Sequence, residues 1–160
     1  MVKTAVISDI HVDSNSDYKE QFDRMSKDGR TWNDFLYNSW SQNNAEKCKW
    51  FLDKLEKQLK EFQESPIVFV THMISHEAFK VPEERESWSY FNAFLGSQKL
   101  EELCKIYRVD YAICGHVHYR KDYEDGGTKW LCRCLNYVSE WSGEKDIHFQ
   151  LADAVELLDL

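Results

Sequence analysis

The stretch that decides the fold runs from residue 109 to residue 118 and reads Val109-Asp110-Tyr111-Ala112-Ile113-Cys114-Gly115-His116-Val117-His118. Its apolar run carries no charge after Asp110, which predicts a strand covered on both faces, as in parallel sheets. Gly115 allows the chain to turn there, and ligands of open α/β sheets collect at the carboxyl ends of strands. His116 and His118 are therefore candidate functional residues, although this stretch alone fits a surface His-x-His pair equally well.

Two other stretches repeat this pattern of an apolar strand that ends in polar residues. Residues 4–11 read Thr4-Ala5-Val6-Ile7-Ser8-Asp9-Ile10-His11, and residues 67–72 read Ile67-Val68-Phe69-Val70-Thr71-His72. Asp9 and His11 are two residues apart, so their side chains leave an extended chain on the same side. Three strands that each deliver a His or Asp at the same end predict a metal site, because neutral imidazole is the commonest protein metal ligand.

Amphipathic segments between these strands predict helices that join them. Apolar residues recur at steps of four and three near residues 45–63, and Ser97 can cap a helix near residues 98–107. Helices between strands imply parallel, right-handed crossovers. The sequence therefore predicts an α/β fold in which strands 3–8, 67–71 and 109–114 lie in one mainly parallel sheet.

The remaining segments carry weaker patterns. Between residues 14 and 43 the aromatic side chains predict helical segments broken near Asp28-Gly29, with those aromatics as core residues rather than a substrate wall. Residues 77–90 are expected to form an exposed loop. Asp125-Gly126-Gly127-Thr128 predicts a hairpin, which could belong to a second sheet. The first part of the tail from residue 147 to residue 160 is expected to be a strand.

Composition limits the classes of protein to consider. The 160 residues are 42% hydrophobic and predict a single domain over residues 1–160. The formal charge of −8 disfavours nonspecific nucleic-acid binding. No apolar run approaches the roughly 20 residues of a membrane span, and the chain starts with a strand-like run rather than a signal peptide, so we expect a cytoplasmic protein without a membrane partner.

The chain has five cysteines, an odd number that cannot pair completely within one chain. Reduced thiols are the simpler interpretation. Cys132 and Cys134 could form half of a zinc site, but no second Cys pair exists. We therefore favour the interpretation that both thiols fill space in the core.

The strand-end residues together offer one carboxylate and four imidazoles: Asp9, His11, His72, His116 and His118. Such a set of oxygen and nitrogen ligands suits one or two divalent transition metals, namely manganese, iron, zinc or nickel. The order of these residues resembles the calcineurin-like metallophosphoesterases. Asp9-Ile10-His11 is similar to the family's D-x-H block, His72 to its single histidine, and residues 115–118 to its G-H-x-H block.

The resemblance implies a sandwich of two sheets flanked by helices, with a site that hydrolyses a phosphate mono- or diester by attack of a metal-bound hydroxide. Asp9, His11 and His118 would hold one metal, and His72 and His116 would hold the second. His76 would line the substrate pocket or simply cap a turn.

The sequence departs from the family in one respect. No glycine is followed by Asp and no asparagine is followed by His, so the family's G-D and G-N-H blocks are absent. Either the chain is shortened after its first strand, or a stretch between about Asn15 and Tyr18 is missing from it. A shortened metal-binding relative with little or no turnover, or a non-catalytic interaction module, is the alternative to an active enzyme. The only residues that could replace the missing ligands are Asp13, Asp17, Asn33 and Asp34.

Overall fold

The computed structural model describes residues 3–7, 24–37, 44–141 and 146–159. These residues form a five-stranded sheet with strand order β1-β4-β5-β7-β6 and a two-stranded sheet of β2 and β3. The strands are β1 (Lys3–Ile7), β2 (Ser26–Lys27), β3 (Arg30–Thr31), β4 (Ile67–Thr71), β5 (Tyr111–Cys114), β6 (Arg120–Asp125) and β7 (Thr128–Arg133). The α-helices are α2 (Asp34–Tyr37), α3 (Asn44–Phe62), α4 (Trp88–Phe91), α5 (Gln98–Ile106) and α6 (Ile147–Ala154). The 3-10 helices are η2 (Glu77–Phe79), η3 (Asn92–Phe94) and η4 (Val138–Glu140).

Four strands of the large sheet run parallel to one another. The register pairs Ile7 with Thr71, Val70 with Ile113, and Cys114 with Cys132. The sequence predicted that strands near residues 3–8, 67–71 and 109–114 lie in one mainly parallel sheet, and this is confirmed. The two predicted long helices are also confirmed. Because parallel strands end at the same edge, the chain leaves β1, β4, β5 and β7 on one side of the molecule.

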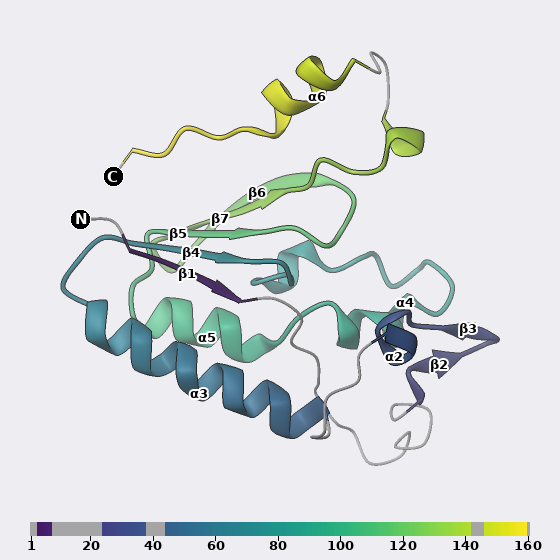
Figure 1. The fold of residues 1–160 in the computed structure, drawn as a ribbon, viewed down its shortest axis with the longest axis horizontal. Helices are drawn as coiled ribbons and strands as arrows, with labels where there is room; N and C mark the ends of the chain where they lie inside the picture. Colours follow the sequence, from purple (N-terminus) through teal and green to yellow (C-terminus); the bar gives the residue numbers. More distant parts are fainter. Residues whose placement is uncertain (1–2, 8–23, 38–43, 142–145, 160) are drawn as a thin grey trace.

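Helices α3 and α5 cover one face of this sheet (Figure 1). Leu59 of α3 and Leu103 of α5 are at most 2% exposed and share a core with Phe69 of β4 and Trp130 of β7. Ser97 caps α5 as predicted, since its hydroxyl accepts a hydrogen bond from the Lys99 N–H at 3.2 Å. The apolar faces of α3 and α5 therefore pack on one side of the sheet, as the periodicity of their sequences predicted.

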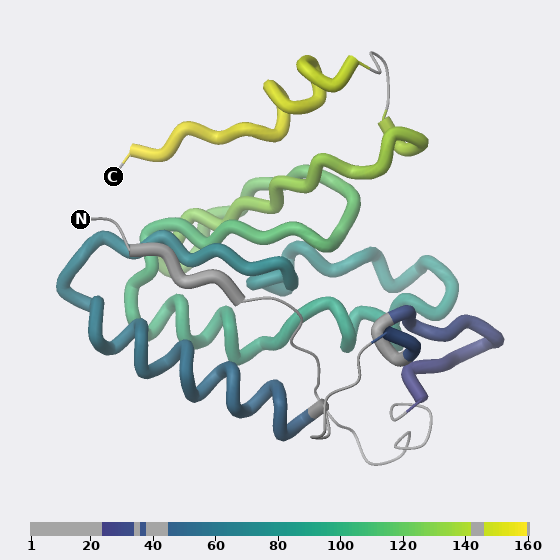
Figure 2. Tube along the Cα trace, in the orientation of Figure 1, coloured from purple at the N-terminus to yellow at the C-terminus, as the bar shows by residue number. Residues whose placement is uncertain are grey.

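The opposite face is covered by the C-terminal segment, which runs back over the sheet (Figure 2). Val68, Tyr111 and Leu131 are buried there, and Leu158 packs against them. The Tyr111 hydroxyl donates to the Asp159 carbonyl at 3.0 Å. Burial on both faces explains the uncharged sequence of β5.

The segment around Asp28-Gly29 differs from the prediction of helices broken at that point. Asp28 and Gly29 both have positive φ, 52° and 76°, and form the turn between the short strands β2 and β3. Two successive left-handed residues suit a hairpin turn, for which Asp-Gly is a preferred sequence. The helical prediction was wrong here because the local turn signal outweighs the weak helical spacing of the aromatics.

The hairpin predicted around Gly126 is confirmed, since β6 and β7 pair antiparallel on either side of it. It belongs to the large sheet and not to a second one, because β7 also pairs with β5 in parallel. Two other predictions need correction. The tail begins with helix α6 rather than a strand, since the Asp146 carboxylate accepts hydrogen bonds from the N–H groups of His148 and Phe149. The expected loop at residues 77–90 contains η2 and the start of α4.

All five cysteines are free thiols. Cys132 is fully buried, and Cys134 is partly buried. Among the helices that the structure describes, none combines the length and the apolar character needed to cross a membrane.

Candidate metal centre

His72 is the first residue after β4, and its backbone is held on two sides. Its carbonyl accepts a hydrogen bond from the Gly115 N–H at 3.2 Å, which ties it to the end of β5. Two residues later, the Ile74 N–H donates to the Leu95 carbonyl at 2.9 Å. Gly96 permits this approach, since a Cβ there would lie 2.2 Å from the Ile74 carbonyl oxygen. These backbone contacts help to fix the segment that carries His72.

The G-H-x-H block forms two successive tight turns. The Val117 N–H donates to the Gly115 carbonyl at 2.8 Å, and the Tyr119 N–H donates to the Val117 carbonyl at 3.0 Å. His116 has a left-handed φ of 67°. A non-glycine residue in this conformation costs about 1 kcal/mol or more and is found where surrounding structure enforces it, often at functional sites. Val117, between the two histidines, is 4% exposed and anchors the turn in the core.

His72 and His116 face each other directly. His116 Nδ1 lies 2.8 Å from His72 Nε2, and the rings are nearly perpendicular, at 79°. Without a cation, one of these two nitrogens must carry the hydrogen between them. Two nitrogens at right angles around one metal, with bonds of about 2.1 Å, would be about 3 Å apart. The observed pair thus has the spacing of neighbouring ligands of a single ion.

The His116 ring also contacts Trp32, which packs against an aromatic cluster of α4 and η3. Trp32, directly after β3, lies 5.6 Å from the His116 ring, measured between ring centroids. The same indole stacks on Phe91 and Phe94 at 5.9 and 6.3 Å. Trp32 packs against both neighbouring hydrophobic clusters, as predicted for the aromatics of this segment. Tyr37 does not follow that prediction, because it is 80% exposed.

His118 has a different environment from the other two histidines. Its Nδ1 lies 2.9 Å from both carboxylate oxygens of Glu140 in η4. The Tyr137 ring packs edge-on against the imidazole at 4.6 Å and 88°. Sequence analysis missed Glu140, because it lies seven residues beyond the end of β7 and not directly after the strand.

Asp9 and His11 lie outside the described residues. The described part of β1 ends at Ile7, which pairs with Thr71, the residue before His72. The chain therefore leaves β1 at the edge where His72 and His116 meet. The possible replacements Asp13 and Asp17 also lie outside the described residues.

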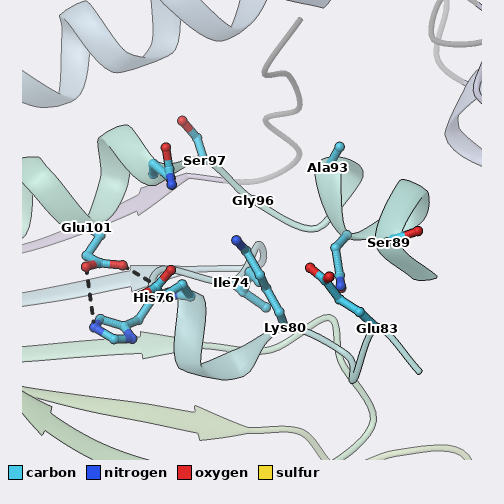
Figure 3. Close-up of a pocket in the computed structure, with 12 residues that line it drawn as sticks. Ile74, His76, Lys80, Glu83, Ser89, Ala93, Gly96, Ser97 and Glu101 are labelled. Carbon is cyan, nitrogen blue, oxygen red and sulfur yellow. Dashed lines mark hydrogen bonds and ion pairs between the residues drawn. The ribbon is translucent and has the colours of Figure 1, made fainter. Parts of the chain in front are cut away.

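His76 lies in the wall of a separate pocket of about 200 Å³ between η2, η3 and the start of α5 (Figure 3). Its side chain is only 4% exposed. His76 Nδ1 accepts a hydrogen bond from the Ala78 N–H at 3.0 Å, so it caps η2. The turn-capping interpretation of His76 is thereby confirmed, and a role of His76 in binding substrate stays a prediction.

The other nitrogen of His76 faces a cluster of charged groups. Nε2 lies 3.5 Å from the Glu101 carboxylate and 3.6 Å from that of Asp125, and these three side chains together could surround a cation. The Lys105 ammonium already bridges both carboxylates, at 2.7 and 2.5 Å. A metal on Nε2 would also require a hydrogen on Nδ1, where the Ala78 N–H already points. We therefore interpret this cluster as an ion-pair network.

The charges in this network shift one another's pKa. Partial burial opposes ionisation of Glu101, but hydrogen bonds from Lys105 and from the Glu77 N–H outweigh it and lower the pKa of Glu101. Hydrogen bonds to Asp125 and Glu101 raise the pKa of Lys105. The ion pairs of Lys105 with Glu101 and Asp125 join α5 to the turn between β6 and β7.

Comparisons with known proteins agree with the motifs. The model of the calcineurin-like phosphoesterase family matches residues 25–120, more than half of the chain. This range contains His72 and the G-H-x-H block and begins after Asp9 and His11. A solved structure, "GAP50 the anchor in the inner membrane complex of Plasmodium", matches over 59% of this chain and 28% of that chain, with 21% sequence identity and a TM-score of 0.40. Among curated proteins, none matches the chain.

Proposed function

Because the chain belongs to the calcineurin-like phosphoesterase family, we propose that it is a metal-dependent phosphoesterase that hydrolyses a phosphate monoester or diester. The observation that carries this proposal is the contact of 2.8 Å between His72 and His116. The two imidazoles come from different strands, lie within the matched region and have the spacing of ligands of one ion. His116 also has a left-handed backbone, a conformation that is found often at functional sites.

The donor set fits divalent transition metals. Asp9, His11 and His118 would hold one cation, and His72 and His116 would hold a second. Neutral imidazoles with a carboxylate suit manganese, iron, zinc or nickel. When bound, such cations polarise phosphate oxygens and make a water molecule more acidic.

The chain's own contribution is to place these ligands rigidly. The backbone contacts of His72 and the double turn of the G-H-x-H block fix two imidazoles before any cation binds. Preorganised ligands avoid the entropic cost of ordering at the moment of binding. We further propose that His76 contributes to a substrate pocket through the cavity beside η2 and α5.

The second candidate function is that of a metal-binding relative with little turnover. It is favoured by the absence of the G-D and G-N-H blocks from the sequence. Without a bridging carboxylate, His72 and His116 would hold a second cation only weakly, and in-line attack assisted by two metals needs both.

Turnover of an aryl phosphate with added manganese tests the proposal. We expect manganese-dependent hydrolysis by the unmodified chain and a loss of about 100-fold or more in His116→Ala, equivalent to roughly 3 kcal/mol of transition-state stabilisation. His148→Ala is the matched control, since His148 is an exposed histidine on α6.

Each outcome of this test selects between the candidates. Manganese-dependent turnover that His148→Ala retains and His116→Ala loses would support the phosphoesterase. Metal binding without turnover would support the second candidate. A chain that neither binds metal nor hydrolyses the ester would contradict both.

A further inference from the structure

Glu140 contacts His118, a predicted metal ligand, and it follows a fourth strand of the sheet. It lies in η4, seven residues after the end of β7, which runs parallel to β5. Its carboxylate is held by its own turn, because Oε2 accepts a hydrogen bond from the Tyr137 N–H at 3.0 Å. The Glu140 N–H in turn donates to the Tyr137 carbonyl at 2.8 Å. The turn thus orients the carboxylate toward His118.

The contact between Glu140 and His118 determines which ring nitrogen carries the hydrogen. An ionised carboxylate can only accept hydrogen bonds, so His118 Nδ1 must be the donor. In the neutral ring, Nε2 is then left with its lone pair available.

His76 provides the opposite case within the same molecule. Its Nδ1 accepts a hydrogen bond from a backbone N–H, so the hydrogen of the neutral ring is on Nε2. That nitrogen faces carboxylates and an ammonium group. Of these two rings, only that of His118 presents an unprotonated Nε2. Histidine ligands of metals almost always donate their other ring N–H to a carboxylate, carbonyl or water, as His118 does to Glu140.

We propose that Glu140 is a positioning residue of the metal centre, which holds His118 in the tautomer and orientation that leave Nε2 available for a divalent cation. This inference rests on the proposed function, because it assigns Glu140 a role toward the metal ligand His118. The Tyr137 ring also contacts the His118 imidazole, edge-on.

The first test reads the tautomer in the metal-free protein, by nitrogen-15 NMR at about pH 8.5, where an ordinary imidazole is neutral. We expect the Nδ1–H form of His118 in the unmodified chain and a mixture of both tautomers in Glu140→Ala. Glu140→Gln, whose amide oxygen can still accept from Nδ1, should retain more of the Nδ1–H form than Glu140→Ala does. Glu84→Ala, at an exposed glutamate, is the control and should leave the tautomer unchanged.

The second test measures cation affinity with cobalt(II), followed by its visible absorption. Glu140→Ala should bind cobalt about 10- to 100-fold more weakly than the unmodified chain, the usual effect of removing a carboxylate that orients a histidine ligand. Thermal unfolding of each variant shows that it is folded. If Glu140→Ala does not fold, Glu140→Gln replaces it, with a smaller loss of cobalt affinity expected.

The outcomes separate this inference from the proposed function. An unchanged tautomer in Glu140→Ala, or unchanged cobalt affinity in a chain that binds cobalt, would overturn the role of Glu140 and leave the metal centre intact. A tautomer that depends on Glu140 in a chain that binds no cobalt would overturn the proposed function. A tautomer and an affinity that change together would support both.

Discussion

At the scale of single residues, His118 and His76 differ in what their ring nitrogens face. His118 leaves Nε2 available, whereas His76 caps η2 and sits in an ion-pair network. We therefore expect His118→Ala to reduce metal affinity at least tenfold, which corresponds to about 1.4 kcal/mol or more of binding free energy. His76→Ala should change the affinity less than twofold, which corresponds to about 0.4 kcal/mol. Elemental analysis of the dialysed, folded variants measures this. Equal loss of metal from the two would show that the ligands are assigned wrongly.

The residues that the sequence predicted were those that directly follow an apolar strand. His72 and His116 could be paired from the sequence because each follows its strand within two residues, and parallel strands end at the same edge. Glu140 could not, because the six residues between it and β7 allow many positions. The surroundings of His76 also depend on Glu101 and Asp125, which come from two distant elements and meet only in the folded chain.

At the scale of elements, the close approach of Gly96 to Ile74 holds the segment after β4. Gly96→Ala would place a methyl group 2.2 Å from a backbone oxygen, so the two segments must move apart. We expect a loss of about 3 kcal/mol in the free energy of unfolding, measured by urea denaturation.

Gly127→Ala is the control for the Gly96 variant. Gly127 has a φ of 83° but nothing within 4 Å of an added Cβ, so only the backbone cost of about 1 kcal/mol applies. A Gly96→Ala variant no less stable than Gly127→Ala would contradict the tight contact.

The ion pairs of Lys105 join α5 to the turn between β6 and β7, and they lead to a second prediction at the scale of elements. The pKa of Glu101 is lowered in the folded chain, so this group contributes stability above its unfolded pKa, near 4.5, which is lost as pH falls through the folded value. Lys105→Met should therefore be less stable than the unmodified chain at pH 7, and the difference should shrink at acid pH.

Urea denaturation at pH 7 and about pH 3 measures the effect of Lys105→Met. Lys99→Met is the control, because Lys99 forms only an exposed pair with Glu102, and such pairs contribute a few tenths of a kcal/mol. A difference for Lys105→Met that is independent of pH would contradict the assigned role of the ion pairs.

The elements that were predicted well have strong periodicity or uninterrupted apolar sequence. Helices α3 and α5 and strands β4 and β5 agree with the sequence-based bounds to within a few residues. Strands β2 and β3 were missed because two residues each carry no period, and α6 was misread because its apolar residues are largely exposed. Short elements depend on turns and caps rather than on periodicity.

At the scale of the whole molecule, the sheet brings four strand ends to one edge, while α3 and α5 cover one of its faces (Figure 1). The sequence has three of the family's motif blocks and lacks the two that supply a bridging carboxylate and an asparagine. We therefore expect one tightly held cation per chain, a second held more weakly, and slow hydrolysis of phosphate esters. Titration with manganese, followed by calorimetry, would show this as one strong and one weak site.

The central claim is that the histidines at this edge bind metal, and anomalous scattering from crystals grown with manganese or zinc tests it most directly. We predict an anomalous peak at about 2 Å from at least one ring nitrogen of His72, His116 or His118. No peak within about 8 Å of these histidines, in crystals whose metal content is confirmed by elemental analysis, would contradict the account.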